Sequence, residues 1–531
     1  MTSLRPLLLA GALAAPASAQ QELLAVGDIL PGAGAVTGVQ AAAVADAGAW
    51  AVVADLASGS GDALVRDGAV FLQQGDPVGT GGASLERVLW AALNAGGDVA
   101  WSAELDVPGA MFLMSALGFG SEPLVLQGAA SAAPGVGAGT FYLSFGTPLL
   151  SDARTVLTAG AIEDPSIPGF AESALLRFDI DAAGQLAAEA VLVKATDPLA
   201  GGLVEEVGLD DHVALAAGGD YLYRARVSGS PSKDVIARNA TVLAEVGGPA
   251  PISGAAWSSL DGGVALNDQG DHAFAGTTVG GASAGFLLTR NGAKVVAAGD
   301  VLPDLAPHAV LGSVLPRIEM AADGTVAWMG TWSAPADNVG LFLDDRLVLR
   351  EGVSQILDRV IASVDGFRMS PDGELLGVAL TFTDGSAGAF LLAVSGALVD
   401  VPGCVGNPGA LQVVSGLPAA GAVLSLTVDQ GQAAGVTPFL AWATAPAAPG
   451  GCGVPVPGLG EVLLSVAAPN PVAVLGGGAP WTGGPFAFQV PIPFSLYGET
   501  IYAQGLFADL AGVAPGEPFR LTGGLELAVG L

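Results

Sequence analysis

The sequence predicts an all-β protein: a seven-bladed β-propeller over Gln20–Gly403, followed by an antiparallel β-sandwich over Cys404–Leu531. A unit of about 50 to 60 residues, built from short strands and turns, recurs seven times, which is typical of propeller blades. No stretch shows a sustained apolar period of about 3.6 residues, so amphipathic helices are not expected. After Gly403 the unit stops, and proline and glycine become frequent while lysine and arginine almost disappear.

Each unit opens with a polar turn that leads into a strand. The seven copies are Gly48–Ala54, Gly97–Ala103, Ala153–Ala159, Asp211–Ala217, Gly270–Gly276, Gly324–Gly330 and Gly373–Ala379. The last position is always small: Ala54, Ala103, Ala159, Ala217, Gly276, Gly330 and Ala379. The position two residues earlier is large and apolar in six copies (Val52, Trp101, Leu157, Leu215, Phe274, Trp328) and is Gly377 in the seventh. Both positions share one strand face, which fits strands that converge on an axis.

Further strands repeat in phase with the first. A second strand is expected at Ala63–Arg66, Ala110–Leu113, Ala174–Arg177, Tyr221–Arg224, Gly285–Leu288, Gly340–Leu343 and Ala389–Leu392, and a third at Val70–Asp76, Leu124–Gly128, Val295–Asp300 and Leu347–Gly352. Either Leu23–Val26 or Leu398–Val401 would complete the last blade, and the sequence leaves this choice open. A solenoid of stacked β units is the alternative architecture.

The N-terminus predicts a secretory signal peptide over residues 1–19. Arg5 precedes the apolar run Leu7–Ala15, and Ala17-Ser18-Ala19 forms a small-x-small cleavage site before Gln20. We therefore expect cleavage between Ala19 and Gln20, with an uncleaved anchor as the alternative. The protein is then exported to the extracellular space, the cell surface or the periplasm.

The charge balance excludes two classes of partner. Asp and Glu number 50 against 18 Lys and Arg, so the net charge is −32. Proteins that bind nucleic acids or anionic membranes need basic patches. No transmembrane segment is expected after the signal, because charge-poor stretches such as Val401–Val428 are broken by proline and glycine. We expect a monomer whose partner is an extracellular protein or a glycan.

The two cysteines, Cys404 and Cys452, predict one disulfide, because an exported protein meets an oxidising environment. The bond would close a loop of about 48 residues and stabilise the fold by roughly 4 kcal/mol in the chain-entropy treatment. Two free thiols remain the alternative, whereas a structural zinc site needs more ligands than two cysteines supply.

The C-terminal region carries a resemblance to a known kind of module. Its marks are Cys404–Leu411, Pro491-Ile492-Pro493, Leu496-Tyr497-Gly498 and Tyr502-Ala503-Gln504-Gly505. These runs resemble a C-terminal β module found on large secreted proteins of environmental bacteria. The upstream turns Gly27-Asp28, Gly75-Asp76 and Gly299-Asp300, each followed by proline, resemble the propeller-type Gly-Asp-x-x-Pro repeats of similar exported proteins. The resemblance implies export and no particular activity, so no functional residue is carried over.

Candidate catalytic residues are weak. Gly281–Gly285 matches the G-x-S-x-G pattern around Ser283, but a strand follows where that motif needs a helix, which favours a chance match over a hydrolase. His212 and His272 lie in adjacent units but one residue out of register, so they should face opposite sides of their strands, and His308 stands apart. We therefore predict no catalytic residues.

Two binding chemistries remain open. Asp179–Gly184 partly matches a calcium loop, and calcium and simple hairpin turns both account for the acidic turns, which also include Asp210-Asp211, Asp268–Asp271 and Asp344-Asp345. Trp101 and Trp328 belong to the predicted core. The other tryptophans are unplaced, and exposed ones could bind sugar rings: Trp50, Trp90, Trp257, Trp332, Trp442 and Trp481.

The leading hypothesis is a secreted or cell-surface binding or structural protein without catalytic activity. The alternative is an extracellular enzyme that acts on polysaccharides through carboxylates in the propeller channel. Propellers host both functions, so the fold does not decide between them.

Overall fold

The structure is a computed structural model. It describes residues 20–530 except 58–62, 80–81, 166–170, 209–211, 282–283, 335, 337, 358, 395–396, 402–403, 405–406, 408, 416–417, 419–422, 430–435, 448–452, 457–459, 466–472, 477–484, 493–495, 497–498 and 509–518. The described residues form two compact units, one over Glu22–Ser395 and one over Gly396–Gly530 with Gln20 and Gln21.

The predicted all-β class is confirmed. The described residues form strands numbered to β46 and no α-helix, and the 3-10 helix Pro303–Leu305 is a single turn. No helix among them is long and apolar enough to cross a membrane.

The unit Glu22–Ser395 contains seven antiparallel sheets, numbered here sheet 1 to sheet 7 in chain order. Sheet 1 has the order β2-β3-β5-β6-β7 with β4 paired to β5: β2 Ile29–Leu30, β3 Gly34–Val39, β4 Ala43–Val44, β5 Trp50–Leu56, β6 Ala63–Arg66, β7 Ala69–Gln73. Sheet 2 has the order β8-β9-β10-β11-β12: Pro77–Val78, Ala83–Leu93, Val99–Asp106, Met114–Phe119, Glu122–Leu126.

The middle sheets repeat this plan. Sheet 3 has the order β13-β15-β16-β17 with β14 on β15: β13 Phe141–Phe145, β14 Leu149–Leu150, β15 Thr155–Glu163, β16 Ala171–Ile180, β17 Leu186–Lys194. Sheet 4 has the order β18-β19-β21-β22-β23 with β20 on β21: β18 Pro198–Leu199, β19 Gly202–Val207, β20 Val213–Leu215, β21 Tyr221–Val227, β22 Lys233–Arg238, β23 Thr241–Glu245. Sheet 5 has the order β24-β26-β27-β28 with β25 on β26: β24 Ala255–Ser259, β25 Val264–Leu266, β26 His272–Gly280, β27 Gly285–Arg290, β28 Ala293–Ala297.

The last two sheets return to the start of the chain. Sheet 6 has the order β29-β30-β31-β32: Val310–Met320, Val326–Trp332, Val339–Leu343, Arg346–Arg350. Sheet 7 has the order β33-β34-β35-β36-β1: β33 Gln355–Ile356, β34 Arg359–Met369, β35 Leu375–Phe382, β36 Ala387–Ala393, β1 Gln20–Ala25. The N-terminal strand therefore completes sheet 7, and the competing segment, β37 (Ala397–Val401), pairs instead with β46 (Phe519–Ala528).

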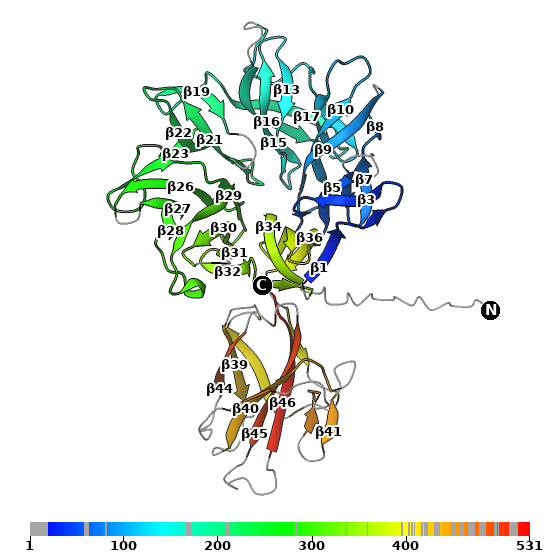
Figure 1. The fold of residues 1–531 in the computed structure, drawn as a ribbon, viewed down its shortest axis with the longest axis vertical. Coiled ribbons are helices and arrows are strands. Elements are labelled where there is room, and N and C mark those ends of the chain that lie inside the picture. Colours follow the sequence, from blue (N-terminus) through cyan, green and yellow to red (C-terminus); the bar gives the residue numbers. More distant parts are fainter. Residues whose placement is uncertain are drawn as a thin grey trace, which may run out of the picture. The chain divides into compact units, whose positions relative to one another are not determined.

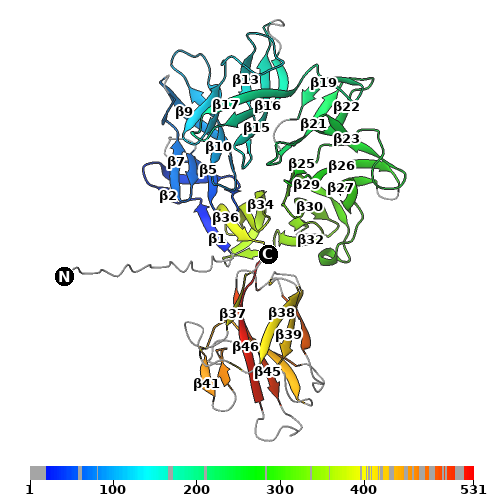
Figure 2. The same cartoon turned by 180° about the vertical axis from the view of Figure 1, so that it is seen from behind.

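The seven sheets follow one another around a common centre in a propeller-like arrangement (Figures 1 and 2). Hydrophobic clusters fill the spaces between successive sheets, as between sheets 1 and 2 or sheets 5 and 6. One cluster joins the first sheet to the last, because Leu24, Ala389 and Leu391 pack with Val52 and Val65. The apolar core therefore runs between the sheets.

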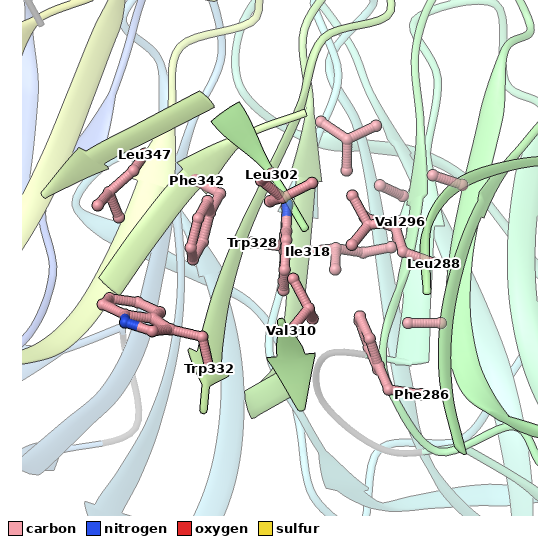
Figure 3. Close-up of a cluster of buried hydrophobic side chains, with 14 of the residues drawn as sticks. Phe286, Leu288, Val296, Leu302, Val310, Ile318, Trp328, Trp332, Phe342 and Leu347 are labelled. Atoms are coloured by element: carbon pink, nitrogen blue, oxygen red, sulfur yellow. The ribbon is translucent and has the colours of Figure 1, made fainter. Parts of the chain in front are cut away.

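The two buried tryptophans of the predicted core have the same role in different sheets. Trp328 of β30 stacks between Phe286 and Phe342, with ring centroids 5.4 and 4.6 Å away, and it is fully buried (Figure 3). Its Nε1 donates to the carbonyl of Asp344 at 2.8 Å, and the Nε1 of Trp101 donates to the carbonyl of Gly120 at the same distance. Core packing of Trp101 and Trp328 is confirmed.

The structure corrects the alignment of two repeat copies. A residue with positive φ ends each turn and donates its N–H to the carbonyl three residues earlier: Gly48, Gly97, Arg154, Gly219, Gly270, Gly324 and Gly373. The third copy is therefore shifted by one residue, because Arg154 occupies a position that is glycine elsewhere. The fourth copy was wrong, because Asp211–Ala217 leads into the inner strand β20 and Tyr221–Arg224 belongs to β21, which follows the turn. The second strand predicted at Ala110–Leu113 was also misplaced, because the corresponding strand, β11, begins at Met114.

The small residues at the end of the seven copies are called the small-residue column below. After the correction this column contains Gly160 and Ala225 in place of Ala159 and Ala217, and all its members are still small. Small residues are required here because the neighbouring inner strand has a bulge at this level. The β13–β15 and β24–β26 ladders both slip at this level, and a Cβ on Gly160 or Gly276 would lie 2.3 Å from the carbonyl oxygen of Ser144 or Ser259. Close approach of the backbone therefore requires the small residue.

The regular secondary structure described in the unit Gly396–Gly530 is also β-strand (Figure 1). Its largest sheet has the order β37-β46-β45-β40-β43, with β40 Thr437–Ala443, β43 Ala473–Gly476 and β45 Thr500–Ala508. A second sheet has the order β38-β39-β44 (Ala410–Ser415, Val423–Asp429, Phe486–Pro491), and β41 (Val454–Val456) pairs with β42 (Gly460–Val462). One hydrophobic cluster takes residues from both larger sheets, including Leu426, Phe488, Leu440 and Phe507.

Candidate functional site

The inner edges of the seven sheets enclose a channel with three described cavities. The first has a volume of about 190 Å³ and is ringed by one apolar side chain from every sheet, in the position just before the repeat turn: Val44, Leu93, Leu150, Leu215, Leu266, Met320 and Met369. This ring was missed at the sequence level, although the position is apolar in all seven units once the turns are aligned on their positive-φ residue. The ring supplies an apolar level of the wall, and polar side chains, among them Asn94, Asp152 and Asn267, line the same cavity.

Three charged side chains of the channel, Arg368, Glu319 and Arg317, are bonded to one another. Arg368 lines all three cavities, and its Nη1 donates to Oε1 of Glu319 at 2.9 Å. The same oxygen accepts a hydrogen bond from Nη1 of Arg317 at 3.4 Å. Each of these side chains is less than about one quarter exposed. One carboxylate therefore serves two guanidinium groups in a partly desolvated site.

The largest of these three cavities has a volume of about 340 Å³ and is lined by residues of sheets 6, 7, 1 and 2. Its polar and aromatic lining consists of Gln40, Trp90, Arg317, Asp365, Phe367 and Arg368. The volume lies at the lower end of the range of small-molecule sites, roughly 300 to 1,000 Å³. A cavity of this size fits a single ring of a ligand.

Trp90 differs from the other tryptophans of its unit. Trp50, Trp101, Trp257, Trp328 and Trp332 are all buried in clusters between sheets, with exposures of 7% or less. Trp90 is only partly buried and lines the 340 Å³ cavity. It lies where the β9–β10 ladder is irregular, opposite Ser102. Two of the unplaced tryptophans belong to the C-terminal part of the chain. Trp442 is partly buried and packs against the core of its own unit, Gly396–Gly530, and Trp481 lies outside the described residues.

Two carboxyl groups lie near this cavity. Asp365 accepts hydrogen bonds from the hydroxyls of Ser363 and Thr381, both at 2.7 Å. Glu351 accepts the N–H of Val364 at 3.0 Å, and burial raises the pKa of this carboxyl, with a smaller contribution from the charge of Asp365. One carboxyl is thus fixed by hydroxyl donors, while the neighbouring one holds its proton more tightly.

Acidic residues at the repeat turns serve as links between sheets. Oδ1 of Asp46 accepts the N–H of Asp372 at 2.9 Å, Oδ1 of Asp152 accepts the N–H of Ala95 at 2.7 Å, and Oδ1 of Asp268 accepts the N–H of Ala217. Burial raises the pKa of Asp46, although its bond to the Asp372 N–H opposes this shift. These three acidic residues therefore have structural partners.

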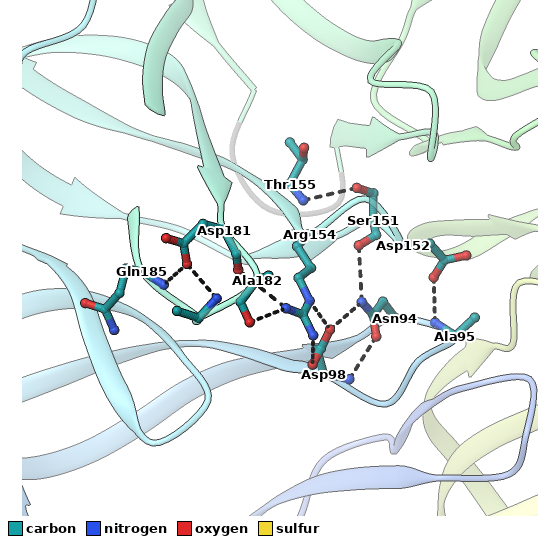
Figure 4. A network of polar contacts seen from close by, with 11 residues as sticks. Asn94, Ala95, Asp98, Ser151, Asp152, Arg154, Thr155, Asp181, Ala182 and Gln185 are labelled. Atoms are coloured by element: carbon teal, nitrogen blue, oxygen red, sulfur yellow. Dashed lines mark hydrogen bonds and ion pairs between the residues drawn. The ribbon is translucent and has the colours of Figure 1, made fainter. Parts of the chain in front are cut away.

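Arginines also join neighbouring sheets. Arg154 forms an ion pair with Asp98 at 2.9 Å and donates to the carbonyls of Asp181 and Ala182 (Figure 4). Arg238 and Arg290 donate to the turn carbonyls of Gly270 and Gly324 in the next sheet, at 2.7 and 2.6 Å. Arg368 differs from them because it faces the channel cavities.

The sequence-level candidates have the following positions. Signal residue Ala19, Ser283 of the G-x-S-x-G match, and Cys452 lie outside the described residues. Gln20 begins β1. The disulfide therefore stays a prediction, as does signal cleavage.

The histidines have separate surroundings. Nε2 of His212 lies 3.4 Å from the carbonyl oxygen of Asp261. His272 stacks on Phe274 with ring centroids 6.4 Å apart, and burial lowers its pKa, with a smaller contribution from Arg238.

The acidic turns are used by their own backbone. Oδ1 of Asp181 accepts the N–H groups of Ala183 and Gln185 in its own turn, whereas Oδ1 of Asp344 accepts the N–H of Val326 on the neighbouring strand β30. Within the described part of the chain, no three His, Cys, Asp or Glu side chains gather as a metal site would require. The hairpin role is thus visible for Asp181, while calcium stays an untested prediction.

The motif residues of the C-terminal unit meet in one buried polar network. Nδ2 of Asn407 and Nε2 of Gln504 both donate to the carbonyls of Glu461 and Thr522, at 2.8 to 2.9 Å. The Glu461 carboxylate, 1% exposed, accepts the N–H groups of Cys404 at 2.7 Å and Gly453 at 2.5 Å. The motif that carries the resemblance therefore has a structural role. The carboxylate also holds the neighbours of the predicted disulfide together.

Comparisons with known proteins add little. No protein-family model and no curated protein matches the chain. Among solved structures, prolyl oligopeptidase B from Galerina marginata is 10% identical with a TM-score of 0.37, and the match covers 75% of this chain and 57% of that one. The Dos1 propeller is 10% identical with a TM-score of 0.30, covering 67% and 78%. An α-L-arabinofuranosidase from Fusarium graminearum is 12% identical with a TM-score of 0.28, covering 67% and 93%. Likeness at this level carries no functional argument.

Proposed function

We propose that this chain is an exported, non-catalytic binding protein that takes a saccharide in the 340 Å³ channel cavity beside Trp90. The single observation that carries the proposal is the placement of Trp90. Every other described tryptophan of Glu22–Ser395 is buried between sheets, whereas Trp90 lines a cavity. An indole face packs against the C–H face of a sugar ring, while Gln40 and Asp365 offer polar groups to its hydroxyls.

The fold part of the proposal is a closed seven-bladed propeller with a C-terminal β-sandwich. It is supported by the seven successive sheets, by β1 in the last sheet and by the cluster that joins sheets 1 and 7. The sandwich is supported by the shared core of the two larger C-terminal sheets. We also propose a signal peptide over residues 1–19, a Cys404–Cys452 disulfide and a monomeric state, with the C-terminal unit similar to the β module of exported bacterial proteins.

The test is binding of the protein from Gln20 onward to a polysaccharide array, with calcium and with a chelator. We expect specific binding that Trp90→Ala reduces by about tenfold or more, since a desolvated aromatic contact is a typical binding hot spot. Phe112→Ala is the matched control, because Phe112 is an aromatic residue that is 79% exposed on the same unit. Equal loss in both variants, or binding without any dependence on Trp90, would contradict the proposal.

A polysaccharide-acting enzyme is the second candidate, and Glu351 is the observation that favours it. A carboxyl with a raised pKa beside a second carboxyl group is an arrangement that general acid catalysis uses. The same array distinguishes the two functions, because an enzyme releases shortened products. Product release that Glu351→Gln and Asp365→Asn both abolish would replace the binding protein with a hydrolase or lyase.

A further inference from the structure

The position of Arg368 indicates the chemical class of the ligand, given the saccharide site proposed above. Arg368 lies near the end of β34, the inner strand of sheet 7, and lines all three cavities of the channel. Its side chain is 19% exposed, so it is largely withdrawn from water without being sealed off. A ligand in any of the cavities therefore meets this guanidinium group.

The hydrogen-bonding capacity of Arg368 is mostly unused. A guanidinium group has five N–H donors in a planar fork, and Glu319 is the only side chain that Arg368 binds among the described residues. The Glu319 carboxylate is shared between two guanidinium groups, because its Oε1 also accepts a hydrogen bond from Arg317. Asp365, the acidic residue that lines the large cavity, accepts hydrogen bonds from two hydroxyl donors. An anion in the cavity would complete the coordination of Arg368.

The surroundings make this arginine unusual for the molecule. The chain has 50 acidic and 18 basic residues, and arginines such as Arg238 and Arg290 bind backbone carbonyls in the neighbouring sheet. A partly desolvated guanidinium that shares one carboxylate is costly unless an anionic group binds there. Carboxylates bind the guanidinium fork through two parallel hydrogen bonds, which gives both strength and orientation.

Trp90 and Arg368 line the same 340 Å³ cavity, so one ligand can contact both. The indole selects a flat ring with an apolar face, and the guanidinium selects a carboxylate. We propose that the channel cavity binds a uronic acid residue of an acidic saccharide, with the ring against Trp90 and the carboxylate on Arg368. This inference rests on the proposed function, since it names the ligand class of that site.

The test compares short uronic acid oligosaccharides with their methyl esters, which have the same ring and no charge. Oligogalacturonate, oligoglucuronate and oligomannuronate of four residues are titrated calorimetrically into the protein at about 0.15 M salt, where the Debye length is about 8 Å. A chelator is present throughout, so that calcium cannot bridge carboxylates. At least one acid should bind about tenfold or more tightly than its ester, the loss expected for a charge-assisted hydrogen bond.

Variants connect this difference to one residue. Arg368→Gln should remove the preference for the acid, and Arg368→Lys should reduce it, because an ammonium group lacks the planar fork. Arg87→Gln is the matched control: it removes the same charge from a β9 side chain that is 52% exposed and outside the cavities. An unchanged acid preference in Arg368→Gln would overturn the inference. If Arg368→Gln fails to fold, the comparison of acid and ester in the unaltered protein still decides.

The outcomes separate the inference from the proposed function. Trp90-dependent binding of neutral saccharides with no preference for acids overturns the uronate inference and leaves the saccharide site standing. Absence of Trp90-dependent binding to any saccharide, neutral or acidic, contradicts both. Displacement of a bound uronate by an acidic peptide at equal concentration would show that the carboxylate alone is recognised, and it would overturn the sugar assignment.

Discussion

Replacement of Gly160 by alanine tests the physical origin of the small-residue column. A Cβ at this position would lie 2.3 Å from the carbonyl oxygen of Ser144 and 3.2 Å from Cδ1 of Leu176. Side-chain carbons essentially never come closer than 3.0 Å, so β13 must move by about 0.7 Å relative to β15. Overpacking of this kind costs about 1 to 3 kcal/mol, partly offset by about 0.4 to 1 kcal/mol from the lower entropy of the unfolded chain.

The net effect on the free energy of unfolding is therefore a loss of about 1 to 2 kcal/mol. The unit Glu22–Ser395 contains about 370 residues, and an unfolding entropy of about 2.1 cal/mol/K per residue converts this loss into only about 1 to 3 °C in Tm. Guanidinium chloride titration of the full chain is the better assay, combined with hydrogen exchange of peptides that cover Phe141–Phe145 and Thr155–Glu163.

Gly218→Ala is the matched control. Gly218 lies in a repeat turn, has an ordinary φ and has no heavy atom within 4 Å of the added Cβ. The same substitution should therefore leave stability unchanged or raise it by up to about 1 kcal/mol. If Gly160→Ala is as stable as Gly218→Ala, and exchange in β13 is unaltered, the close approach of the inner strand does not explain the column.

Four further predictions follow from single contacts. Arg154 has φ of +58°, so Arg154→Ala should cost about 0.5 kcal/mol or more beyond Arg154→Gly, because both variants lose the ion pair and only alanine keeps the strain; denaturant titration of both variants measures the difference. Glu461→Gln should destabilise the C-terminal unit by about 1 to 3 kcal/mol, seen as faster hydrogen exchange there, because a buried carboxylate that accepts two N–H groups is replaced. Peptide mapping without reductant should find Cys404 linked to Cys452, and two separate peptides would refute this. Burial lowers the pKa of His272 below 6.5, so the unfolded state takes up a proton before the folded state does as the pH falls. The free energy of unfolding, measured by denaturant titration, should therefore decrease from pH 7.5 to pH 5.5, and it should decrease less in His272→Phe.

The sequence allowed prediction of the fold class, and the reasons lie in particular residues. Six of the seven turns contain glycine at the positive-φ position, and five of these turns were aligned correctly from the sequence: Gly48, Gly97, Gly270, Gly324 and Gly373. The third turn was aligned one residue too early because Arg154 stands where the other turns have glycine. Its φ of +58° is rare for a residue with a side chain and is stabilised by contacts distant in sequence. The fourth copy failed because the inner strand β20 has the same alternation of small and large residues as the strand after the turn.

The candidate site was only partly predictable. The sequence singled out Trp90 as an unplaced tryptophan, but six residues shared that status, and only burial separates the one in the channel from those between sheets. The apolar ring of Val44 and its six counterparts needed the turn alignment to be right. The pairing of Arg368 with Glu319 joins inner strands of two sheets and has no local signature in the chain.

The distribution of charge explains why composition alone misleads about this channel. A net charge of −32 suggests an acidic interior that attracts cations. Asp46, Asp152 and Asp268, the acidic residues of the repeat turns in sheets 1, 3 and 5, are instead bonded to backbone N–H groups of neighbouring turns. Their charge is thus used to join the sheets. The side chains left facing the largest cavity are few, and two of them are arginines. The local field at the ligand site is therefore set by Arg317, Arg368 and Asp365, which is why the ligand class has to be argued from these residues.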